Sequence, residues 1–146
     1  MRKVPLIGGL AAVAVGVVAS LWLAWHLRRA PDHADATLGR VIYDGHCASC
    51  HGANLEGQAD WRRRKPDGKL PAPPHDETGH TWHHSDRQLF EITKYGVRHF
   101  APAGYASDMP AFGDVLSDGE IRSALEFIRS RWSVTVRERQ RSLSRE

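Results

Sequence analysis

The sequence predicts an all-α protein in which a single N-terminal membrane helix precedes a small helical domain. Three features predict it. The first is a run without charged side chains from Val4 to Trp25. The second is a pair of Ser-x-x-Gln/Glu capping-box signals, starting at Ser85 and Ser117, each followed by apolar residues at helical spacing. The third is that no segment alternates apolar and polar residues convincingly, as a half-buried strand would.

Length and composition narrow the class further. The chain has 146 residues, of which 41% are hydrophobic and 25% are charged, so there is room for one compact domain but not for a two-domain enzyme or a large barrel. Two cysteines are too few for a disulfide-dense scaffold or a zinc site of four thiolates. Nine histidines are many for a chain of this size and require an explanation.

Residues 1–30 are predicted to form a signal-anchor helix. The uncharged run of 22 residues would span roughly 33 Å as a helix, enough for the hydrocarbon core of a bilayer. Basic residues flank the run, and Trp22 and Trp25 stand where a helix would reach the headgroups. The alternative is a cleaved signal peptide, although the run exceeds the usual apolar segment of about 7–15 residues. Both interpretations place residues 31–146 outside the cytoplasm, and we expect a single-pass protein of the bacterial inner membrane with a periplasmic domain.

The rest of the chain divides into a polar linker (31–35), a folded domain (36–132) and a charged tail (133–146). Because the tail is Arg-rich and has no sustained apolar face, we expect it to be mobile. Within the domain, helices are predicted over 36–43, 85–95 and 117–132, and the last carries a single apolar stripe from Ile121 to Trp132. Residues 52–79 have no periodicity, and a loop this long is expected only where it surrounds something other than protein.

Residues Cys47 to His51 read C-x-x-C-H, the attachment motif of c-type haem. On one helical turn each thiol can add to a vinyl group of the haem, and the next residue, His51, can supply an imidazole nitrogen to the iron. The competing interpretations are a thioredoxin-like redox pair, a zinc site and a plain disulfide. The first lacks its strand–helix context, the second lacks further thiolates, and haem accounts best for His51 together with export. We therefore predict one haem c, attached through Cys47 and Cys50.

From residue 36 to residue 132 the sequence resembles the class I cytochromes c. The resemblance rests on three pieces in the right order: Gly39 and Tyr43 ahead of the C-x-x-C-H motif, Met109–Pro110 on a late loop, and a capped last helix from Ser117 to Trp132. It implies a small helical fold around one covalent haem. It also implies that the first and last helices cross closely, with Gly39 giving room and Phe127 or Ile128 packing nearby.

Met109 is the candidate for the sixth iron ligand, so that His51 and Met109 would be the metal ligands. A thioether suits an iron that changes oxidation state without binding substrate, and Met1 lies at the wrong end of the anchor. Two alternatives stay open. Met109 could be a core filler, because methionine adapts well to irregular gaps. A second histidine could instead be the sixth ligand of the iron, and His99 is the nearest candidate by its position on the loop.

The family also implies that a proline carbonyl orients the other ring nitrogen of His51, as partners of this kind do for metal-bound histidines. Three prolines follow the motif at suitable positions: Pro71, Pro73 and Pro74. The long intervening loop departs from the shortest members of the family, so the sequence does not select among them.

Two further clusters have no assigned role. His80, His83 and His84, with His75 and Asp76 nearby, could form a copper or zinc site, but adjacent histidines do not easily share one ion. A polar turn leading into the helix at Ser85 is the preferred interpretation. Trp61 and the basic residues Arg62 to Lys65 could dock an acidic partner or a phosphate, although such charge runs usually face water.

The net charge of +3 does not belong to the predicted domain. Residues 36–132 carry 12 basic and 13 acidic side chains, a net charge of −1, and the basic surplus lies in residues 1–35 and 133–146. The overall charge therefore gives no strong reason to expect an acidic partner.

These patterns predict a one-electron carrier rather than an enzyme: a membrane-anchored, monohaem c-type cytochrome of a periplasmic respiratory chain. Its partners would be a redox protein donor and acceptor (an oxidase, reductase or dehydrogenase) and the membrane, with no nucleic acid. One alternative is a fixed cytochrome subunit of a larger oxidase or dehydrogenase complex. The others are a haem sensor and an exported copper-handling domain.

Overall fold

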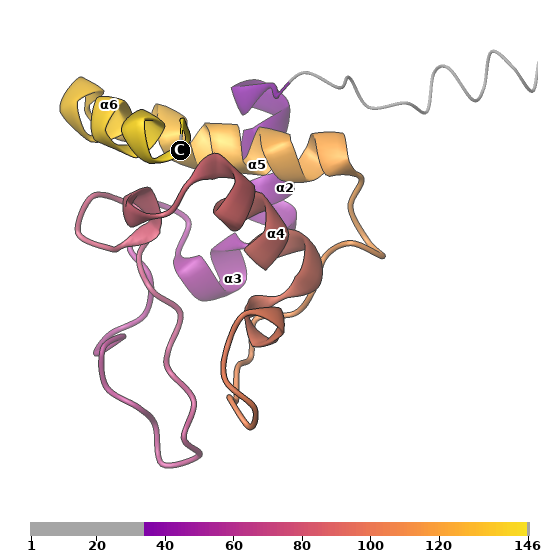
Figure 1. Cartoon of the computed structure of the whole chain (residues 1–146), viewed down its shortest axis with the longest axis vertical. Helices are drawn as coiled ribbons and strands as arrows, with labels where there is room; N and C mark the ends of the chain where they lie inside the picture. Colours follow the sequence, from indigo (N-terminus) through magenta and orange to yellow (C-terminus); the bar gives the residue numbers. More distant parts are fainter. Residues whose placement is uncertain (1–33, 146) are drawn as a thin grey trace, which may run out of the picture. The chain divides into compact units, whose positions relative to one another are not determined.

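The computed structural model describes residues 34–145, and the regular elements in that range are all helical (Figure 1). In chain order they are α2 (Ala36–His46), α3 (Ala48–His51), the 3₁₀ turn η1 (Thr81–His83), α4 (Asp86–Tyr95), the 3₁₀ turn η2 (Val97–His99), α5 (Asp118–Ser130) and α6 (Val134–Leu143). The prediction of an all-α domain is thus confirmed for the described residues. The predicted membrane helix lies outside them, as does most of the linker. Within residues 34–145, no helix has the length and apolar character needed to cross a bilayer.

Side-chain caps define where the helices begin. At α5 the predicted capping box is complete: the Ser117 hydroxyl accepts from the Glu120 N–H (3.3 Å), and the Glu120 carboxylate accepts from the Ser117 N–H (2.8 Å). At α4 only half of the predicted box forms. The Ser85 hydroxyl accepts from the Gln88 N–H (3.3 Å), but the Gln88 side-chain oxygen lies 3.0 Å from Nδ1 of His84 instead of returning to the cap.

Helices α2 and α5 cross closely at Gly39. A Cβ atom at this position would lie 1.9 Å from the carbonyl oxygen of Ser123 and 2.9 Å from Cβ of Phe127. Only glycine permits that approach. One turn along α2, the buried ring of Tyr43 packs against the Phe127 ring with centroids 5.3 Å apart. The expected close crossing, with Phe127 beside Gly39, is confirmed.

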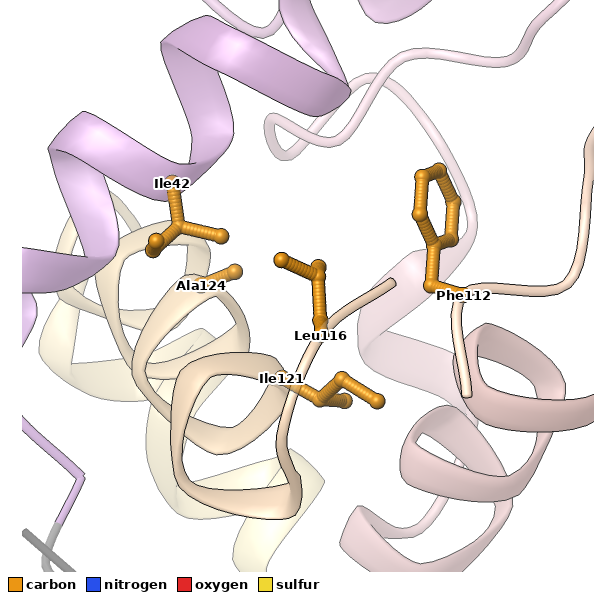
Figure 2. Packing of buried hydrophobic residues seen from close by; sticks show 5 residues of the cluster. All are labelled: Ile42, Phe112, Leu116, Ile121 and Ala124. Atoms are coloured by element: carbon orange, nitrogen blue, oxygen red, sulfur yellow. The ribbon is translucent and has the colours of Figure 1, made fainter. Parts of the chain in front are cut away.

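The core consists of two apolar clusters, and α5 contributes to both. The first lies between α2, α5 and the segment that leads into α5 (Figure 2), and its members are Ile42, Phe112, Leu116, Ile121 and Ala124. The second lies further along α5, and its members are Tyr43, Leu55, Phe127, Ile128 and Trp132. The predicted stripe of α5 is therefore the structural centre of the domain, because it joins both clusters.

The chain between α3 and η1 makes the long irregular excursion that the sequence predicts (Figure 1). It doubles back on itself: the Gln58 N–H donates to the carbonyl of Ala72 (2.9 Å), and the Ala72 N–H donates to the Gln58 side-chain oxygen (2.9 Å). At its base the His75 N–H donates to the carbonyl of Leu55 (2.8 Å). These hydrogen bonds hold the two halves of the excursion together and close its base, without forming a β-strand.

The prediction of a mobile tail is wrong for residues 134–143, which form α6. Ser133 caps this helix by accepting from the Val136 N–H (3.4 Å). The side-chain amide of Gln140 is fully buried and donates to the carbonyl of His84 (3.2 Å) and to the Asp86 carboxylate (2.8 Å). Apolar periodicity did not reveal α6 because buried polar contacts to the η1–α4 segment hold much of it in place.

Candidate functional site

The residues predicted to hold haem meet at one cavity. It has a volume of about 440 Å³, and Cys47, Cys50, His51 and Met109 all line it. Its apolar walls come from the long excursion, from α4 and from α5. Cofactor sites are typically cavities of about this size with mainly apolar walls and few polar groups.

The two cysteines flank one helical turn. The Cys50 and His51 N–H groups both donate to the carbonyl of Cys47 (3.1 and 2.9 Å), so the thiols and the imidazole project from the same turn. Both cysteines are free thiols, Cys47 half-buried and Cys50 exposed. Burial, together with the nearby Cys50, raises the pKa of the Cys47 thiol to about 11. The plain disulfide considered above is not formed, and both sulfurs are available for thioether bonds.

His51 is buried and held by a single hydrogen bond. Its Nδ1 lies 2.8 Å from the carbonyl oxygen of Pro73. Since a carbonyl only accepts, Nδ1 carries the proton, and Nε2 keeps the lone pair that a metal ligand needs. Burial lowers the pKa of His51 and so favours the neutral imidazole, although the hydrogen bond to the Pro73 carbonyl acts in the opposite direction. Among the three candidate prolines, the structure thus selects Pro73.

A residue that the sequence analysis did not place at the site lies directly against His51. The imidazole of His75 stacks on that of His51 with ring centroids 3.9 Å apart and planes inclined by 22°, and both rings line the cavity. In the sequence, His75 stands near the cluster of His80, His83 and His84, and it was not predicted to reach the cavity. The sequence signal for this contact was the position of His75, two residues after Pro73. A segment that contacts His51 at Pro73 also brings the next residues close to it.

Met109 lines the cavity and also packs against the first core cluster. Its N–H donates to the Ser107 hydroxyl (3.1 Å). The adjacent Asp108 carboxylate accepts from Lys65 (3.1 Å) and from Lys69, which ties the Met109 loop to the long excursion. His99, the rival ligand, lies on η2, is exposed, and is not among the residues that line the cavity.

His80, His83 and His84 each also contact a different side chain outside their cluster. His80 stacks on Trp61 (5.4 Å, 13°), His83 stacks on Trp82 (3.6 Å, 27°), and Nδ1 of His84 lies 3.0 Å from the Gln88 side-chain oxygen. Among residues 34–145, no group of three or more His, Cys, Asp or Glu side chains could hold a metal ion. Trp61 lines the cavity, and the guanidinium of the exposed Arg62 lies 4.0 Å from the centroid of its ring.

The donor set and the cavity fit a covalently attached haem. Two free thiols, an imidazole beside them and a thioether that lines the same cavity are groups that can attach a porphyrin and ligate its iron. The apolar walls suit a hydrophobic macrocycle, and an apolar setting influences the redox potential of the iron. This arrangement supports the transfer of single electrons.

Comparison with known proteins agrees with this chemistry. The family model described as Cytochrome c matches residues 36–132. The cbb3-type cytochrome c oxidase subunit FixP of Azorhizobium caulinodans is 27% identical to the chain over 92 residues, which cover 63% of the chain. The match spans only 28% of the length of FixP. No solved structure matches the chain.

Proposed function

Because the chain belongs to the cytochrome c family, whose members transfer electrons and carry haem at C-x-x-C-H motifs such as Cys47–His51, we propose that it is a one-electron carrier of a periplasmic respiratory chain. The observation that carries this proposal is the shared cavity of Cys47, Cys50, His51 and Met109. When bound there, haem supplies an iron that accepts and releases one electron.

The proposed roles of His51 and Met109 follow from their chemistry. His51 offers Nε2, because its Nδ1 is engaged by Pro73. Met109 offers a soft thioether, which raises the potential relative to a second imidazole. With His51 and Met109 as its ligands, the iron would have no position open to a substrate, which suits a carrier of electrons. The donor and acceptor would be redox proteins that dock briefly, since electron-transfer interfaces tend to be small.

An absorption spectrum of the oxidised protein tests the ligand pair. We expect a low-spin spectrum with the long-wavelength band of sulfur–iron ligation. Met109→Ala should remove this band, while the matched variant His99→Ala should keep it. A high-spin iron that binds added ligands in the unmodified protein would refute the carrier function. Loss of the band in His99→Ala alone would refute the assignment of Met109.

We further propose that residues 1–30 anchor the haem domain (36–132) to the bacterial inner membrane through the linker 31–35. The uncharged run of 22 residues supports this proposal. Alkaline extraction of isolated membranes should leave the full-length chain in the pellet. Release of a chain that lacks these residues, identified by its mass, would favour the cleaved signal peptide instead.

A fixed subunit of a larger oxidase is the second candidate, and the similarity to FixP favours it. Purification from membranes in mild detergent separates the two candidates. A carrier should elute alone after a salt wash, whereas a fixed subunit should remain with integral membrane subunits in constant proportion.

A further inference from the structure

The imidazole of His51, a proposed iron ligand, contacts the imidazole of another histidine, His75. This contact has no role in the function described so far. His75 lies flat against His51, with ring centroids 3.9 Å apart and an interplanar angle of 22°. The hydrogen bond from Nδ1 of His51 to Pro73 fixes one point on the edge of the ring. This bond and the ring's covalent attachment to Cβ restrain the His51 ring at one edge, and the His75 ring adds a contact against its face that resists motion out of the ring plane.

His75 is itself held rigidly. Its Nδ1 lies 2.8 Å from the hydroxyl oxygen of the buried Thr81. Its carbonyl accepts from the indole N–H of Trp132 (2.8 Å), a buried member of the second core cluster. Its own N–H donates to the carbonyl of Leu55 (2.8 Å). Contacts from η1, from the segment just after α5 and from the long excursion therefore fix both the backbone and the ring of His75.

The tautomer of His75 follows from its hydrogen bond to Thr81. The Thr81 hydroxyl has one proton and directs it to the carbonyl of Pro74 (3.5 Å), which leaves Nδ1 of His75 as the donor to Thr81. The bond to Thr81 therefore holds one edge of the His75 ring while its face lies against His51.

We propose that His75 is a positioning residue for the iron ligand: its ring fixes the plane of the His51 imidazole. This inference rests on the proposed role of His51 as a ligand. The rigid segment Pro73–Pro74–His75 would then restrain that ligand in two ways, because its first carbonyl fixes the tautomer and holds one edge, and its third side chain supports the face. Orientation of a metal-bound imidazole by neighbouring groups tunes the metal.

The test is the proton NMR spectrum of the haem-loaded ferric protein, in which the paramagnetic shifts of the haem methyl groups depend on the plane of the axial imidazole. His75→Leu removes the flat ring and should change the pattern of these shifts. His75→Phe keeps a flat ring but loses the bond to Thr81, and it should keep the wild-type pattern. The matched control is His83→Leu, which removes an exposed stacked histidine that does not line the cavity and should leave the shifts unchanged.

Two results would overturn the proposal: a wild-type pattern in folded, low-spin His75→Leu, or an equal change in His75→Phe and His75→Leu. If His75→Leu does not fold, His75→Asn replaces it, because the amide can still donate to Thr81 while the ring is lost, and the same outcomes apply. Failure of the proposed function has a different signature: a high-spin spectrum in the unmodified protein.

Discussion

Replacement of Gly39 by alanine tests the packing on which the domain depends. The new Cβ would meet the carbonyl oxygen of Ser123 at 1.9 Å and its carbonyl carbon at 2.5 Å. These are backbone atoms of α5 that no rotamer change can move, so α2 and α5 must separate and both core clusters must loosen. Overpacking of this kind costs about 3 kcal/mol, at the upper end of its usual range. The better helix propensity of alanine offsets about 1 kcal/mol of this cost.

A net loss of about 2 kcal/mol should lower the midpoint of thermal unfolding of the haem-loaded protein by roughly 8–16 °C, measured by circular dichroism. Gly45→Ala is the control in the same helix, because a Cβ there meets nothing within 4 Å. It should raise stability by up to about 1 kcal/mol. If Gly39→Ala melted at the same temperature as Gly45→Ala, the close crossing would not carry the stability that we assign to it.

Two further variants examine contacts away from the cavity. Gln140→Ala removes the buried amide that joins α6 to His84 and Asp86, and it should lower the free energy of unfolding in urea by about 1–3 kcal/mol. The exposed neighbouring Arg141→Ala should be nearly neutral, and equal effects of the two would contradict an ordered α6. The backbone N–H and the hydroxyl of Ser117 lower the pKa of the Glu120 carboxyl below its ordinary 4.5. The stability that this carboxylate contributes is therefore complete above about pH 4.5 and is lost as the pH falls through the lower folded value. Glu120→Gln should flatten this acid-dependent loss in urea midpoints measured from about pH 7 to pH 3, and unchanged acid dependence would show that the capping box has no such effect.

The sequence determined the features whose cause is local. The C-x-x-C-H spacing places two thiols and an imidazole on one helical turn, wherever that turn lies in the fold. The capping box of Ser117 and Glu120 needs only residues three apart, and it forms as predicted. The close approach at Gly39 was implied by the resemblance to the class I cytochromes c, and the structure confirms it. The half-formed box at Ser85 shows the limit of such signals, since Gln88 found a competing partner in His84.

The tertiary structure decided everything that depends on the path of the chain. Pro71, Pro73 and Pro74 are chemically equivalent as acceptors, and only the course of the excursion brings the carbonyl of Pro73 to His51. The stacking of His75 on His51 arises in the same way. Helix α6 escaped prediction because its order rests on contacts with residues more than 50 positions earlier in the chain, made by a polar side chain that no periodicity marks. Spacing along the chain reveals which chemical groups a segment carries. The partners of those groups, such as the Pro73 carbonyl and the His75 ring at His51, come from distant segments that only the fold brings alongside.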